Sequence, residues 1–156
     1  MRRLRLPLLA TLALLPAAAT AQEHDAHRVG ASVGYSSRFE RAFVALDLLV
    51  WLDRNFALVP NGSFSDVGGV NRWTAGVELQ WSPPAYRLHP RLLGWVGAGL
   101  SAVTEDPQGV RDSTTRDLVA NAVAGVGYDL PASPFIQLRV ALGGPADVSL
   151  SVGVRF

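Results

Sequence analysis

The sequence has no cysteine, and although it carries 14 basic residues it has no lysine, because every one of them is arginine. Without cysteine the chain cannot hold a disulfide scaffold, a cysteine-ligated zinc site, an iron–sulfur cluster or a thiol nucleophile. Charge is also scarce: 17% of the residues are charged and 49% are hydrophobic, whereas about 25% charged residues is usual for a soluble domain. This composition excludes a disordered chain and argues against a nucleic-acid partner. The length of 156 residues favours a single domain.

The first 21 residues have the three parts of a secretory signal peptide. A start with three arginines precedes a leucine-rich apolar run, and residues 19–21 form a small-residue cleavage site. An uncleaved membrane anchor is the alternative, but the run is short for a span and is broken by Pro7 and Pro16. We therefore predict Sec-type export, cleavage near Ala21, and a flexible tail over residues 22–27.

The charge and hydropathy of the exported part differ from those of the whole chain. Cleavage would leave 135 of the 156 residues, with 11 of the 14 arginines against 13 acidic residues, a balance of −2. The longest apolar stretch that remains, residues 42–52, is interrupted by Asp47. A membrane helix needs roughly 18 uninterrupted apolar residues. The sequence therefore predicts no transmembrane helix after the signal peptide.

The rest of the chain alternates between apolar and polar residues with a period of two, which is typical of β-strands. The last segment is the clearest, because Val148, Leu150, Val152, Val154 and Phe156 share one face while serine, glycine and arginine occupy the other. Seven earlier segments follow the same pattern, although the facing of the glycine- and alanine-rich fifth segment is ambiguous. The predicted strands are residues 28–38, 41–52, 55–64, 70–81, 92–103, 117–128, 135–142 and 148–156.

Turn-forming residues lie between these segments. Eight antiparallel strands joined in sequence predict an all-β fold, an eight-stranded up-and-down β-barrel over residues 28–156. The strand lengths are close to the 9–11 residues of a tilted transmembrane strand. The predicted turns are residues 36–40, 53–54, 65–69, 82–90, 104–115, 130–134 and 143–147.

Alternation does not decide which face of the barrel is outside. A soluble barrel buries its apolar face, whereas an outer-membrane barrel turns that face to lipid and encloses a polar lumen. The aromatic residues favour the membrane, because they gather near the strand ends around an aliphatic band, as in the two girdles at membrane interfaces; Trp95 is the exception. The predicted girdle residues are Tyr35, Phe43, Trp51, Phe56, Phe64, Trp73, Trp81, Tyr128 and Phe135.

The polar face supports the same choice. It is too poor in charge for a typical solvent-exposed surface, but it suits a narrow eight-stranded lumen that has room only for side chains. Charges buried in such a lumen need partners of opposite sign. We therefore predict a lumen network of three acids and three bases, Asp47, Glu78, Asp117, Arg72, Arg139 and Arg155.

The closing strand, apolar at every second position and ending in Phe156, resembles the assembly signal of bacterial outer-membrane barrels. Together with the signal peptide and the strand number, it makes the chain similar to the small eight-stranded OmpA-like and OmpX-like transmembrane barrels over residues 28–156. The resemblance implies a monomer in outer-membrane lipid. It also implies delivery by periplasmic chaperones and insertion by the barrel assembly machinery, which would recognise Leu150, Val152, Val154 and Phe156. The 82–90 connection is long for a periplasmic turn, which is a departure from this pattern.

The chain offers little for catalysis. Its three histidines, His24, His27 and His89, lie outside the predicted strands, whereas a hydrolase needs a nucleophile beside a firmly held base. His24, Asp25 and His27 have the chemistry of zinc or copper ligands, but a flexible tail is the simpler interpretation of a segment next to the cleavage site. We therefore predict no catalysis, no metal site and no cofactor.

Three functions remain open. The first is a non-enzymatic outer-membrane barrel with a structural or surface-contact role, whose lumen the charge network occludes. The second is a small channel or hydrophobic-ligand conduit of the OmpW type, because five glycines in residues 92–103 and 117–128 either leave space in the lumen or allow strong strand curvature. The third is a soluble periplasmic β-barrel carrier. The acidic residues Glu105, Asp106 and Asp112 are expected in a solvated loop rather than in a calcium site.

Overall fold

A computed structural model describes residues 27–38, 40–67, 69–82, 91–107, 115–142 and 147–156. The predicted signal peptide, His24, Asp25 and His89 lie outside these ranges. The described residues form a closed, all-antiparallel barrel of eight strands in sequence order, which confirms the predicted fold. No helix in this part of the chain is long and apolar enough to span a bilayer. The strands are β1 (Arg28–Ser36), β2 (Arg41–Trp51), β3 (Phe56–Val67), β4 (Val70–Trp81), β5 (Leu92–Pro107), β6 (Thr115–Tyr128), β7 (Ser133–Leu142) and β8 (Asp147–Arg155).

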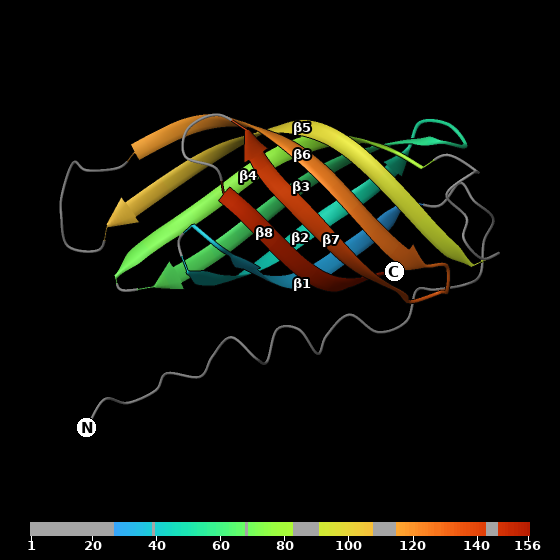
Figure 1. The fold of residues 1–156 in the computed structure, drawn as a ribbon, viewed down its shortest axis with the longest axis horizontal. Helices are drawn as coiled ribbons and strands as arrows, with labels where there is room; N and C mark the ends of the chain where they lie inside the picture. Colours follow the sequence, from blue (N-terminus) through green and yellow to red (C-terminus); the bar gives the residue numbers. More distant parts are fainter. Residues whose placement is uncertain (1–26, 39, 68, 83–90, 108–114, 143–146) are drawn as a thin grey trace, which may run out of the picture.

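The barrel closes between its first and last strands. Their ladder runs from the Gly30–Arg155 pair to the Ser36–Ser149 pair. It is extended by Phe156, whose N–H donates to the Val29 carbonyl at 2.9 Å and whose carbonyl accepts from the Val29 N–H at 3.1 Å. In Figure 1 the strands run obliquely to the long axis, and the C-terminus lies at the same end as the β6–β7 turn. We call this end the terminal rim and the opposite end, where β5 ends and β6 begins, the loop rim.

Three strands, β3, β5 and β6, extend further toward the loop rim than the sequence indicated. β5 has 16 residues, and pairs such as Arg72–Glu105 continue its ladder with β4 beyond the apolar alternation. Antiparallel pairing joins backbone groups, so it does not stop where polar side chains begin. Glu105 and Asp106 therefore belong to a strand and not to a loop, which corrects that expectation; Asp112 lies outside the described residues.

The two faces of the wall are the reverse of those in a soluble protein. Large apolar side chains point outward and are exposed, for example Leu46 at 60%, Leu100 at 52% and Ile136 at 50%. Polar side chains point inward, and Glu78 and Arg155 are only 1% and 5% exposed. A monomer in water rarely presents a continuous apolar surface of this kind. The wall has the apolar exterior and polar interior of a barrel in a membrane.

Three of the predicted girdle residues face the lumen instead. Phe43 contacts the lumen-facing side of Gly34, and Phe135 is 5% exposed inside the barrel. Trp51 packs on a buried lumen cluster that includes Leu49. The prediction was wrong for these three because position near a strand end was weighed above facing. Phe43 and Trp51 are each an even number of residues from Asp47 on the same strand, so their side chains point to the same face of the sheet as Asp47.

Glycines on β6 make room for the indole ring of Trp95 in the lumen. A Cβ placed on Gly125 would lie 2.4 Å from two ring atoms of Trp95, which faces inward from β5. Trp95 is 7% exposed, so its ring has little space into which it can move. By contrast, a Cβ on Gly62 of β3 would meet only the Thr74 carbonyl at 3.5 Å. The facing of β5, ambiguous from its sequence, is thus fixed by where the Trp95 ring fits.

We predict that Gly125→Ala destabilises the barrel by about 1–3 kcal/mol, because the added methyl group overpacks the lumen against Trp95. Gly62→Ala is the matched control and leaves stability nearly unchanged. Urea unfolding of each purified variant in lipid vesicles, followed by tryptophan fluorescence, measures both effects. Equal stability of the two variants would contradict the packing of Trp95 on Gly125.

Candidate functional site in the barrel lumen

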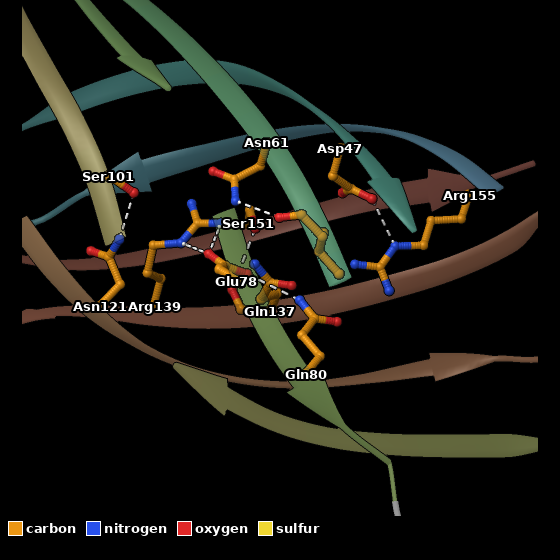
Figure 2. A network of polar contacts seen from close by, with 11 residues as sticks. Asp47, Asn61, Glu78, Gln80, Ser101, Asn121, Gln137, Arg139, Ser151 and Arg155 are labelled. Atoms are coloured by element: carbon orange, nitrogen blue, oxygen red, sulfur yellow. Dashed lines mark hydrogen bonds and ion pairs between the residues drawn. The ribbon is translucent and has the colours of Figure 1, made fainter. Parts of the chain in front are cut away.

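The buried polar groups of the barrel are gathered in its lumen. Alternation directs every second side chain inward, and closure brings inward positions of distant strands face to face. Figure 2 shows the result, a set of carboxylates, guanidiniums and amides that contact one another across the interior. The buried polar residues are Ser36, Ser65, Glu78, Gln80, Ser101, Asn121, Ser133, Gln137, Ser151 and Arg155.

An ion pair between β4 and β7 crosses the middle of the lumen. Glu78 Oε1 accepts from Arg139 Nε at 2.7 Å and lies 2.6 Å from Arg139 Nη2. The other oxygen of Glu78 accepts from Gln80 Nε2 at 3.0 Å. The Glu78 side chain is fully buried. Both carboxylate oxygens are thus satisfied, which is the condition under which a buried charge is tolerated.

A second pair closes the lumen nearer the terminal rim. Arg155 Nε donates to Asp47 Oδ1 at 3.0 Å. The guanidinium carbon of Arg155 also lies 4.9 Å from the Trp95 ring centre and 4.6 Å from the Phe135 ring centre. Cations are attracted to aromatic faces at such distances. One arginine, one carboxylate and two rings from four different strands therefore fill the same cross-section.

The remaining two members of the predicted network are placed differently. Arg72 lies near the loop rim, with Glu105 and Asp147 each 3.8 Å away at their closest atoms. Asp117 is exposed, and among the described residues no salt bridge to it is found. The network is therefore two tight pairs and one looser group, not a balance of six residues. Asp117 shares the parity of the lumen-facing residues of β6, but it lies too close to the start of that strand to be enclosed.

Neutral polar side chains fill the spaces between the charges. Asn121 donates to Ser101 Oγ at 2.6 Å, and Asn61 donates to the Val59 carbonyl at 3.1 Å (Figure 2). Such contacts satisfy polar atoms that have lost water. Toward the loop rim, beyond the Glu78–Arg139 pair, a cavity of about 70 Å³ remains. The lumen is thus filled at these two levels, and the cavity lies on the loop-rim side of both.

Sequence reasoning missed several residues of this interior. Asp147 was assigned to a turn, yet it accepts from Ser36 Oγ at 2.7 Å. Arg28 pairs with Asp129 at 3.1 Å at the terminal rim, and neither had been selected. Alternation along the strand could have identified Asp147 and Arg28 as lumen-facing. Asp147 lies an even number of residues from the lumen-facing Arg155 of β8, and Arg28 from the lumen-facing Ser36 of β1. Asp129 lies in the β6–β7 turn, where parity carries no information.

Other predicted residues are found on the outer face. The exposed fraction is 52% for Leu150, 49% for Val152 and 48% for Phe156, and Val154 is half-buried beside them. Among the predicted girdle residues, Phe56 and Trp81 stack with ring centres 6.5 Å apart, and Phe64 and Trp73 lie 4.4 Å apart. Tyr35 is exposed and Tyr128 half-buried, on the same parity as their outward neighbours. These positions are compatible with two girdles that lack Phe43, Trp51 and Phe135.

The described residues contain no group of three or more metal-ligating side chains. His27, the only histidine among them, is exposed and precedes β1. The other two histidines lie outside the described ranges. The charged chemistry of the lumen, as described, is mainly that of the Glu78–Arg139 and Asp47–Arg155 pairs, while Arg155 Nη2, Gln137 Oε1 and Trp95 Nε1 are buried without a hydrogen-bond partner. Such an arrangement suits filling and rigidifying an interior.

Comparison with solved structures identifies this architecture. The N-terminal β-barrel domain of Pseudomonas aeruginosa OprF aligns with a TM-score of 0.65 at 17% identity, covering 86% of this chain and all of that domain. The chain has the fold of the small eight-stranded outer-membrane β-barrels. Neisserial surface protein A aligns with a TM-score of 0.63 at 14% identity, covering 83% of this chain and 94% of its own.

The same fold also carries an enzyme. The outer membrane enzyme PagL aligns with a TM-score of 0.52 at 12% identity over 83% of this chain and 98% of its own. Fold alone therefore does not decide between a catalytic and a non-catalytic barrel. No family model and no curated protein sequence matches the chain.

We predict that Glu78→Gln destabilises the barrel by about 3–5 kcal/mol, because it leaves the Arg139 guanidinium without its countercharge in the lumen. The double variant Glu78→Leu with Arg139→Met recovers most of this loss, since it removes both charges. Urea unfolding in lipid vesicles measures the free energies.

The control for this prediction is Glu105→Gln. The Glu105 side chain is 35% exposed and 3.8 Å from Arg72, so its removal costs at most about 1 kcal/mol. If Glu78→Gln and Glu105→Gln lowered the free energy of unfolding equally, the Glu78–Arg139 pair would contribute no more to stability than the partly exposed Glu105–Arg72 contact.

Proposed function

We propose that this chain is an integral outer-membrane β-barrel with a structural or surface-contact role, an occluded lumen and no catalytic activity. The observation that carries the proposal is the reversed polarity of the closed wall, apolar outside and polar inside. In water this exterior would be unsatisfied, whereas in a bilayer it meets acyl chains while every strand keeps its backbone hydrogen bonds in the closed ladder. Two solved barrels of the same fold, Neisserial surface protein A and the outer membrane enzyme PagL, are named for the cell surface or the outer membrane, which supports this location.

Occlusion is supported by two levels of contact in series. The Glu78–Arg139 pair crosses the middle, and Arg155 with Trp95 and Phe135 fills the terminal half. An ion that crossed the barrel would have to displace both. The cavity of about 70 Å³ adjoins Arg139 on the loop-rim side. This filling favours a plugged barrel over a conduit for ions or hydrophobic ligands.

We predict that the mature protein is recovered in the outer-membrane fraction. Without boiling it runs on a detergent gel as a compact band, and it shifts after boiling, because a closed strand ladder resists detergent at low temperature. Comparison of boiled and unboiled fractions measures both points. Recovery in osmotic shock fluid instead would contradict membrane insertion and favour the soluble carrier.

We predict that the purified protein gives no stable single-channel steps in planar bilayers. The double variant Glu78→Ala with Arg139→Ala opens the middle level and leaves the terminal level closed. The double variant Trp95→Ala with Arg155→Ala opens the terminal level and leaves the middle level closed. Only the combination of all four substitutions gives steps, provided that its gel band still shifts on boiling. Regular large currents from the unmodified protein would contradict occlusion and favour the channel.

We also propose that the barrel assembly machinery recognises the outer face of β8 together with Phe156, which follows β8 and extends its ladder. Phe156→Ala keeps the backbone hydrogen bonds to Val29 and removes only the exposed ring. We expect less inserted protein and unchanged export, measured as heat-shifting band and as signal-cleaved chain. Phe56→Ala removes another exposed ring at the same rim and is the control. Equal insertion of the two variants would show that the terminal ring has no special part in assembly.

A further inference from the structure

The cavity toward the loop rim has an unusual lining. It occupies about 70 Å³ and is bounded by three arginines, Arg41, Arg72 and Arg139, and one acidic residue, Asp147. Five serines and one threonine add six hydroxyl groups. The charged lining is therefore mainly cationic. Of the neutral lining residues seven are polar, mostly hydroxyls that donate hydrogen bonds as readily as they accept them, and four are apolar.

Acidic residues near the cavity balance two of these three arginines, Arg139 tightly and Arg72 loosely. Glu78 neutralises Arg139 at 2.6 Å, but Arg72 approaches Glu105 and Asp147 only to 3.8 Å. Asp147 also accepts from Ser36 Oγ at 2.7 Å. Arg38 and Arg41 also repel the Arg72 charge, although less strongly than Asp147 and Glu105 attract it. An anion placed among these guanidiniums would relieve that repulsion.

The donors in the cavity wall are arranged for oxygen atoms. Asn121 donates to Ser101 Oγ at 2.6 Å, so the hydroxyl hydrogen of Ser101 remains available to another acceptor. Guanidinium groups bind phosphate and sulfate oxygens through pairs of N–H donors, which gives short, strong hydrogen bonds. A metal cation would meet three arginines in the same space, which excludes it on charge.

The volume sets the size of the ligand. A water takes about 30 Å³ in the liquid, so about 70 Å³ has room for only a few heavy atoms. A tetrahedral oxyanion has that many heavy atoms, whereas a nucleotide or a sugar ring does not fit inside. The cavity lies on the loop-rim side of the Glu78–Arg139 pair, so a larger molecule would reach it with a single anionic group.

We propose that this cavity binds one phosphate or sulfate group, either as the free ion or carried at the end of a larger molecule. Arg41 and Arg72 hold the group and the hydroxyls of the wall complete its shell. The site does not require the barrel to be plugged or to lie in any particular membrane. A failure of the proposed function would therefore not contradict this site, and the absence of the site would not contradict the proposed function.

Isothermal titration of the full barrel in a neutral detergent tests the site, with inorganic phosphate and sulfate as separate titrants in a buffer free of both. We expect saturable binding near one ion per barrel. Arg72→Gln and Arg41→Gln each weaken it about tenfold or more, since each removes charged hydrogen bonds. Each variant is first shown to be folded by its gel shift on boiling.

Arg54→Gln is the matched control. It removes one positive charge from an exposed turn at the terminal rim, away from the cavity. We expect its affinity to equal that of the unmodified protein. No saturable heat with either ion, or equal weakening by Arg54→Gln and Arg72→Gln, would overturn the proposal and leave the cavity as a space for water.

Glucose 1-phosphate as a third titrant distinguishes the sources. Binding comparable to that of inorganic phosphate, and lost in Arg72→Gln, shows that the site accepts a group attached to a larger molecule. Binding of the inorganic ions only shows that the ligand is a free ion. Both results support the site and assign its ligand.

Discussion

Closure of the strand ladder between β1 and β8 is the constraint on which the rest of the molecule depends. It removes both free sheet edges and leaves every strand paired on two sides. It also forces the inward side chains of eight strands into one narrow space. Because water has little room there, those side chains must satisfy one another. The Glu78–Arg139 pair and the Arg155–Asp47 pair, from strands that are not neighbours in the ladder, meet only because the barrel is closed.

The lumen combines two ways of stabilising a buried cation. Arg139 is held by a carboxylate that is itself completed by Gln80, so the charge is balanced by hydrogen bonds. Arg155 has a carboxylate on one side and the faces of Trp95 and Phe135 on the other, so part of its desolvation is offset by aromatic contact. The second arrangement needs large aromatic side chains inside the lumen. It explains why large rings lie inside a barrel whose glycines on β6 make room for them.

The barrel is more tightly filled toward the terminal rim than toward the loop rim. Apolar and aromatic side chains close the terminal half, whereas arginines and hydroxyls line the cavity at the other end. One end therefore resembles a protein core and the other a polar binding site. In a membrane this difference would separate the part of the lumen that supplies stability from the part that remains accessible to small ligands.

The sequence by itself determined the strands, their number and the polarity of most positions, because alternation with a period of two is a local property of an extended chain. Only the tertiary structure decided which inward residues meet. Glu78 and Arg139 are 61 residues apart and Asp47 and Arg155 are 108 apart, and their contact depends on the tilt and stagger with which the barrel closes. The same closure placed Asp147 beside Arg72 and left Asp117 exposed near the loop rim. It also enclosed the side chains of Phe43, Trp51 and Phe135. Strand parity carried the facing of the three aromatic residues, but the distances across the lumen had no local signal.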